Sequence, residues 1–151
     1  MKACGCAASF VAGLALPRMR VSGIEDPRRP EGIWPFAWHV AKDRIGNERE
    51  IALVMNPKTA RSQQLMHVHI LRFRLGERAH VDALPAGVET DGAVTLSLVN
   101  LHAVFAAAIA TVGAERIGDH GILVMRAPTS GFRAVITDRT SPQSFTLNDC
   151  H

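Results

Sequence analysis

Short apolar runs separated by polar, glycine- and proline-containing segments predict a β-sheet. Residues 51–55 form a continuous apolar run of strand length, which is typical of a buried strand. Residues 66–73 form a second run of this kind. Two further β-rich runs, 121–126 and 132–138, flank the turn sequence Pro-Thr-Ser-Gly at 128–131. We therefore expect these last two runs to pair as an antiparallel hairpin.

Apolar residues recur with helical spacing in two other segments. Trp34 and Trp38 lie one turn apart with Pro35 in the first turn, which predicts a short amphipathic helix that ends near Gly46. Residues 98–117 are rich in alanine and are predicted to form the longest helix. The order of strands and helices indicates an α+β fold in which helices pack against an antiparallel sheet.

Composition supports one globular domain over residues 1–151. The chain is 47% hydrophobic and 21% charged, which is sufficient for a sizeable core. A net charge of +3, spread along the chain, argues against a nucleic-acid partner. The apolar residues 3–16 are too short for a membrane span, so they are either a targeting segment or a strand-like or poorly ordered start. The polar tail from Thr140 is expected to be mobile.

Two histidines in the second apolar run are the strongest candidates for chemistry. Alternate residues of a strand share a face, so His67 and His69 project together while Met66, Val68 and Ile70 point into the core. Neutral imidazole is available at physiological pH and can attack phosphorus or transfer a proton. A covalent nucleotidyl-histidine is therefore a plausible intermediate.

The loop before these histidines carries groups that suit a phosphate. Lys58 and Arg61 can offset its charge, and Asn56, Ser62 and Gln63 can donate hydrogen bonds to its oxygens. A histidine pair on a strand is, by itself, equally consistent with a solvent-facing pair or with two metal ligands. The loop favours the catalytic interpretation.

Residues 56–70 also carry a family resemblance. Their Asn-Pro-Lys-Thr-Ala-Arg-Ser-Gln-Gln-Leu-Met-His-Val-His-Ile sequence resembles the asparagine, arginine, Ser/Thr-Gln and His-hydrophobic-His-Ile run of the CDP-diacylglycerol pyrophosphatases, within the histidine triad (HIT-like) superfamily. Further matches lie at residues 16–27, 36–41, 118–125 and 132–136. The resemblance thus extends over most of residues 14–136.

This resemblance implies a HIT-like antiparallel sheet packed by helices and a hydrolase that cleaves the pyrophosphate bond of CDP-diacylglycerol to CMP and phosphatidate. It places the nucleophile of the triad pattern on His67 and the last histidine on His69, with Leu65 in place of the first. Catalytic roles are expected for these two histidines, and substrate binding for the loop residues. Neither a metal nor another cofactor is expected.

The resemblance also implies a nucleotide-lipid substrate, contact with a membrane surface and location at the cell inner membrane. Family members usually carry a membrane-spanning segment before the matched part, so the chain is expected to be a shortened relative or incomplete at its start. A homodimer is left open. Two alternative functions stay open as well: a soluble HIT-type hydrolase of nucleotide conjugates, and a non-catalytic nucleotide- or metal-binding remnant.

Overall fold

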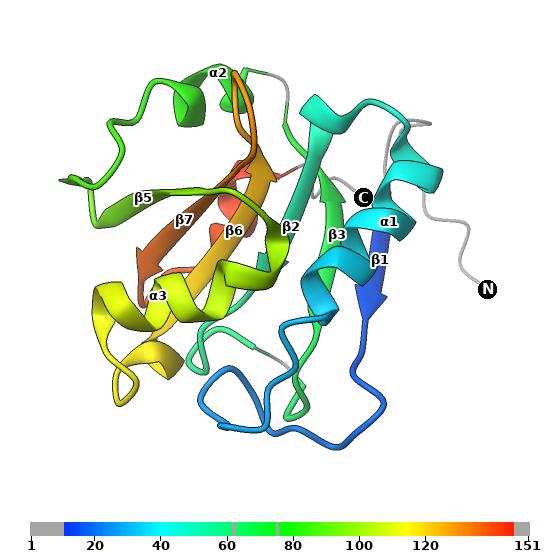
Figure 1. The fold of residues 1–151 in the computed structure, drawn as a ribbon, viewed down its shortest axis with the longest axis vertical. Helices are drawn as coiled ribbons and strands as arrows, with labels where there is room; N and C mark the ends of the chain where they lie inside the picture. Colours follow the sequence, from blue (N-terminus) through cyan, green and yellow to red (C-terminus); the bar gives the residue numbers. More distant parts are fainter. Residues whose placement is uncertain (1–10, 62, 75, 147–151) are drawn as a thin grey trace.

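The computed structural model describes residues 11–61, 63–74 and 76–146, and within them it contains a seven-stranded antiparallel sheet (Figure 1). The strand order is β1-β3-β2-β6-β7-β5-β4, and every neighbouring pair is antiparallel. The strands are β1 (Ala12–Ala15), β2 (Ile51–Met55), β3 (Val68–Arg72), β4 (Glu89–Thr90), β5 (Ala93–Leu98), β6 (His120–Arg126) and β7 (Phe132–Asp138). The predicted α+β fold is confirmed.

Two helices cover one face of this sheet and enclose the larger core (Figure 1). Trp34 on the first helix is fully buried and packs edge-on against Phe105 of the second, with ring centroids 5.5 Å apart. A shorter helix and a C-terminal 3-10 turn cover a smaller core on the opposite face. The helices are α1 (Ile33–Ile45), α2 (Glu77–Asp82) and α3 (Val104–Val112), and the 3-10 turns are η1 (Glu48–Glu50), η2 (Leu101–Ala103), η3 (Ile117–Asp119) and η4 (Pro142–Phe145).

The predicted strands are found, but the predicted longest helix is not. The strand expected at 66–73 occurs as β3, which begins two residues later. The helix expected at 98–117 is wrong at both ends, because α3 covers only Val104–Val112. It is also not the longest helix, since α3 has nine residues and α1 has thirteen. Leu98 still belongs to β5, and the side chain of Asn100 caps η2 before α3 begins. Gly113, with a φ of +88°, ends α3 in a conformation that favours glycine.

The beginning of the described chain is strand-like. Of the apolar residues 3–16, those at 12–15 form β1, which pairs with β3 at the edge of the sheet. Residues 1–10, on which the targeting hypothesis mostly depends, lie outside the described residues, as do the three cysteines. No helix within the described ranges has both the length and the apolar character needed to cross a membrane.

The segment after Thr140 is folded onto the sheet, so the expectation of a mobile tail is wrong as far as Thr146. Thr146 is buried and forms a β-bridge with Phe73. Pro142 sits directly over Gly121 of β6, where an added Cβ would lie 2.5 Å from the proline Cδ. The absence of a side chain at Gly121 therefore allows η4 to approach the sheet closely.

Candidate active site

The candidate site lies where β2 ends and β3 begins, on the face of the sheet opposite α1. Val68 and Ile70 of β3 are buried in the larger core beneath α1, as their alternation in the sequence predicts. His67 and His69 consequently face the other way. Asn56, the first residue after β2, is buried beside them.

The His67 imidazole is held by the backbone. His67 is only 6% exposed, and its Nδ1 lies 2.8 Å from the carbonyl oxygen of Leu65. A carbonyl oxygen can only accept, so Nδ1 must carry the hydrogen in this contact. The neutral ring then has its lone pair on Nε2, which is the form that a nucleophile requires.

His69 is kept neutral next to His67. The two rings meet edge to face, with centroids 4.8 Å apart and planes at 72°. The pKa of His69 is lowered to about 4. Burial is the main cause, and repulsion from the charge that His67 would carry is the second. The Asn56 amide donates to His69 Nε2 at 3.4 Å, so the hydrogen of the neutral His69 ring lies on Nδ1.

Asn56 is fixed by a hydrogen-bond network with η4 that sequence reasoning did not find. Its Nδ2 donates to Gln143 Oε1 at 2.9 Å, and its Oδ1 accepts from Ser141 Oγ at 2.5 Å. Ser141 also caps η4 by accepting from the backbone N–H of Gln143. A serine directly before a proline is a helix-start signal, and it was the available hint that this segment is ordered.

Arg61 enters the site bound to a carboxylate. It lines a small pocket together with Asn56 and His67, and its guanidinium donates to both oxygens of Glu25, at 2.6 and 3.2 Å. Although burial raises the pKa of Glu25, hydrogen bonds and the nearby positive charges outweigh it and lower this pKa. The pair rests over Gly23, where an added Cβ would overlap Arg61 Nη1 and lie 2.5 Å from Glu25 Oε2.

The other predicted loop residues are placed less directly. The Lys58 ammonium pairs with Asp119 at 3.0 Å, about half exposed to solvent. The hydrogen bond from Lys58 is the main cause that lowers the pKa of Asp119. Gln63 is exposed on the loop, and Ser62 lies outside the described residues. The structure thus brings together His67 and three of the proposed partners, His69, Asn56 and Arg61.

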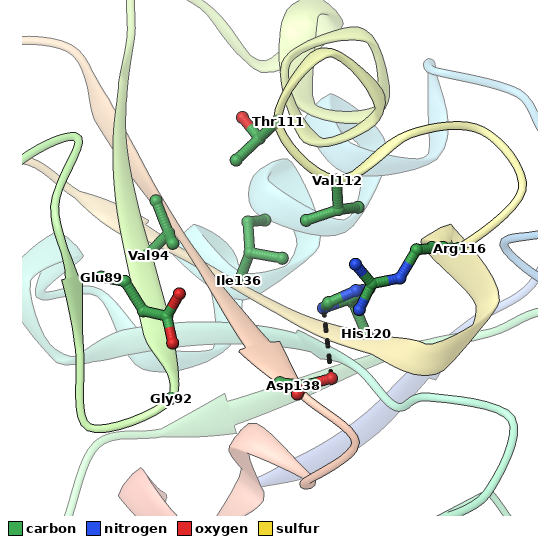
Figure 2. A pocket seen from close by; sticks show the side chains of 9 residues that line it. All are labelled: Glu89, Gly92, Val94, Thr111, Val112, Arg116, His120, Ile136 and Asp138. Atoms are coloured by element: carbon green, nitrogen blue, oxygen red, sulfur yellow. Dashed lines mark ion pairs between the residues drawn. The ribbon is translucent and has the colours of Figure 1, made fainter.

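A separate cavity of about 220 Å³ surrounds His120 on the α3 side of the sheet (Figure 2). His120 Nδ1 lies 3.1 Å from the carbonyl oxygen of Thr137 and 4.0 Å from a carboxylate oxygen of Asp138. Its Nε2 is buried without a hydrogen-bond partner among the described residues. Glu89 and Arg116 also line this cavity, so it carries both signs of charge.

The described residues contain no cluster of three or more histidine, cysteine, aspartate or glutamate side chains arranged to hold a metal ion. The chemistry that the site itself offers is that of an oriented imidazole flanked by an amide, a second imidazole and a paired guanidinium. These groups suit nucleophilic attack on an anionic phosphorus centre.

Comparison with known proteins gives two findings. The model of a family described as CDP-diacylglycerol pyrophosphatase matches residues 10–116. A probable CDP-diacylglycerol pyrophosphatase from Mycobacterium leprae (strain TN) is 42% identical over 67 residues, which cover 38% of this chain and 25% of that protein. The chain therefore spans about a quarter of the length of this curated relative.

Proposed function

The chain belongs to the CDP-diacylglycerol pyrophosphatase family, and on this premise we propose that it hydrolyses CDP-diacylglycerol to CMP and phosphatidate through a nucleotidyl-histidine on His67. The observation that carries the proposal is the fixed imidazole of His67, whose Nδ1 is tied to the Leu65 carbonyl, so that Nε2 is the nitrogen left to act on the substrate. A HIT-like mechanism is part of this proposal.

In the first step, His67 Nε2 attacks the cytidylyl phosphorus and forms a P–N bond. The bond from that phosphorus to the bridging oxygen breaks, and phosphatidate leaves with the electron pair. In the second step, water attacks the same phosphorus and releases a proton to solvent, the P–N bond breaks, and CMP leaves as the imidazole regains its lone pair. The net reaction consumes one water and cleaves one pyrophosphate bond.

The neighbouring groups act on charge and orientation. In this proposal, the N–H at His69 Nδ1 and the Arg61 guanidinium, which Glu25 holds in the structure, donate to phosphate oxygens, whose negative charge increases as the leaving group departs. Lys58 adds a more distant positive charge. Leu65 stands at the position of the first triad histidine, and its backbone carbonyl accepts the hydrogen bond that orients His67.

Incubation of the purified chain with CDP-diacylglycerol labelled in the cytidylyl phosphate tests the proposal, in the presence and absence of a chelator. We expect labelled CMP and, after acid-free quenching, a labelled protein that the His67→Ala variant does not form. Release of CMP without any labelled protein would contradict the covalent step. No release at all would contradict the hydrolase assignment.

The same assay separates the two alternative functions. A soluble HIT-type hydrolase would cleave dinucleotides or nucleotide conjugates in preference to the lipid. A non-catalytic remnant would bind CMP or a divalent metal without turnover. The pairing of a buried, oriented imidazole with phosphate-compatible neighbours favours turnover over binding alone.

Because CDP-diacylglycerol carries two acyl chains, we place the reaction at a membrane surface, with the nucleotide-lipid as substrate. Location at the cell inner membrane stays a prediction from the family resemblance, and formation of a homodimer stays open. Co-purification of activity with membranes and sedimentation of the purified chain check them.

A further inference from the structure

Exposed apolar side chains gather beside the histidines. Leu14 on β1 is 45% exposed, Leu16 and Met19 in the segment after β1 are 53% and 58% exposed, and Leu65 before β3 is 39% exposed. They are four of the seven large hydrophobic residues recorded as exposed within the described ranges. Contiguous apolar patches on a protein surface mark interaction sites.

The backbone places this patch on the active-site face. Leu14 is the direct cross-strand neighbour of His69, so the two side chains project from the same face of the sheet. Leu16, Met19 and Leu65 line one shallow groove, where the segment after β1 runs beside the loop that enters β3 (Figure 1). The carbonyl of Leu65 holds the His67 ring, so the patch begins at the residue that orients the proposed nucleophile.

Two positive charges border the apolar side chains. Arg18 and Arg20 are exposed and line the same groove. In the part of the chain that the structure describes, neither forms a salt bridge, whereas Arg28 and Arg61 nearby are each paired with a carboxylate. Apolar side chains next to unpaired cations are characteristic of surfaces that bind the interface of anionic bilayers.

We propose that Leu14, Leu16, Met19 and Leu65, with Arg18 and Arg20, form a docking surface for a bilayer that contains anionic lipids. The apolar side chains enter the boundary between headgroups and acyl chains, and the arginines contact lipid phosphates. Docking in this orientation brings the His67 face to the level of the headgroups. The catalytic benefit rests on the proposed function, whereas the binding itself does not.

The charge pattern favours a bilayer over a second copy of the chain. Two copies meeting through this patch in a two-fold contact would bring Arg18 and Arg20 of both chains together, and the described residues that line the groove include no carboxylate to offset them. An anionic lipid surface neutralises the same charges. Charge complementarity therefore identifies the occupant.

Vesicle co-sedimentation tests the surface without any hydrolysis. The probes are vesicles of phosphatidylcholine with one quarter phosphatidylglycerol, and vesicles of phosphatidylcholine alone, neither containing CDP-diacylglycerol. We expect the whole chain to bind the anionic vesicles more tightly, and Leu16→Asp/Met19→Asp to lose at least tenfold in affinity. Arg18→Ala/Arg20→Ala should lose about fivefold per arginine, on the anionic vesicles only.

A matched control uses two exposed apolar residues elsewhere. Val88 and Val99 are 54% and 90% exposed and lie outside the patch, so Val88→Asp/Val99→Asp makes the same chemical change and should bind like the parent. The His67→Ala variant should also bind normally, since it removes the proposed nucleophile and leaves the patch intact. Thermal unfolding of each variant checks that the fold is retained.

Three outcomes would overturn the proposal: no binding of the parent to anionic vesicles, equal loss in the patch and control variants, or a dimer in sedimentation that Leu16→Asp/Met19→Asp converts to monomer while vesicle binding is absent. If the parent binds vesicles but does not hydrolyse CDP-diacylglycerol, the docking surface stands and the proposed function fails. If the parent hydrolyses detergent-dispersed CDP-diacylglycerol but does not bind vesicles, the proposed function stands and the docking surface fails.

Discussion

His67 and His120 lie at the same end of the strands but on opposite faces of the sheet. His67 immediately precedes β3 and belongs to the face away from α1. His120 is the first residue of β6. It projects from the same face as Ile122 and Val124, which are buried beneath the helices. In both rings, Nδ1 is held by a backbone carbonyl, at 2.8 Å for His67 and 3.1 Å for His120.

The surroundings of the two rings differ in charge. His67 has the amide of Asn56, a neutral His69 and the Arg61–Glu25 ion pair close by. His120 has Asp138 at 4.0 Å, and Glu89 and Arg116 also line its cavity, so two carboxylates accompany one guanidinium there. Carboxylates repel a phosphate anion. An oriented imidazole is therefore insufficient to define this site, and the loop before β3 supplies the difference.

The largest effect is expected from removing His67. His67→Ala should lower kcat for CDP-diacylglycerol by at least about a thousandfold, because it removes the atom that forms the proposed covalent bond. His120→Ala should keep activity within about tenfold, although loss of a buried ring should lower stability. Steady-state kinetics and thermal unfolding of both variants test this pair. Near-normal turnover by His67→Ala would disprove the assigned nucleophile.

A smaller effect is expected from the network that fixes Asn56. Ser141→Ala leaves the buried Asn56 Oδ1 without its described hydroxyl donor, which should lower the free energy of unfolding by about 1–2 kcal/mol. Turnover should fall about tenfold as Asn56 loses its position. Ser144→Ala, on the exposed side of the same 3-10 turn, is the control and should have no measurable effect on either quantity. Equal behaviour of the two variants would show that η4 does not support the site.

The contribution of the loop cations is expected to be unequal. Arg61→Ala should lower kcat/KM by about ten- to a hundredfold, and Lys58→Ala by less, because a guanidinium can hold two phosphate oxygens and an ammonium offers one mobile charge. Gly23→Ala should resemble Arg61→Ala in kinetics, since the new Cβ displaces the end of the arginine side chain. Stability should change little in these variants. Unaltered kinetics of Arg61→Ala would remove Arg61 from phosphate binding and leave the role of His67 intact.

The smallest effect concerns pH. The folded-state pKa of His69 is about 4, below its ordinary value near 6.5, so the unfolded chain binds a proton more readily than the folded one. His69 therefore favours folding above pH 6.5, and this contribution declines as pH falls toward 4. Because the ring is partly exposed, we expect a loss of roughly 1 kcal/mol over this window. Denaturant unfolding of the parent and of His69→Phe at pH 7 and 4.5 measures it, and identical slopes with pH would contradict the shift.

Local patterns predicted much of the fold. The continuous apolar run of β2 and the turn between β6 and β7 indicated strands that the structure confirms. The alanine-rich stretch at 98–117 was misleading, because helix propensity is high there while Leu98 pairs in a sheet and Gly113 stops the helix. Strand pairing between distant segments is not encoded in a local window.

The site was predictable to a similar degree. The alternation around His67 placed both imidazoles on one face without any knowledge of the fold. Gln143 was missed because it lies 87 residues after Asn56 in the sequence. The close packing of Pro142 against Gly121 brings it to Asn56. Glu25, which binds Arg61, was missed for the same reason. Contacts of this kind depend on packing between segments that are remote in sequence.

Leu65 divides two tasks between its main chain and its side chain. The carbonyl that aligns His67 is present whichever amino acid occupies the position, while the side chain faces outward and is 39% exposed. Evolution can therefore vary the outward group without disturbing the alignment of the imidazole. The side chain at this position can therefore belong to the proposed docking surface while the main chain keeps the imidazole aligned.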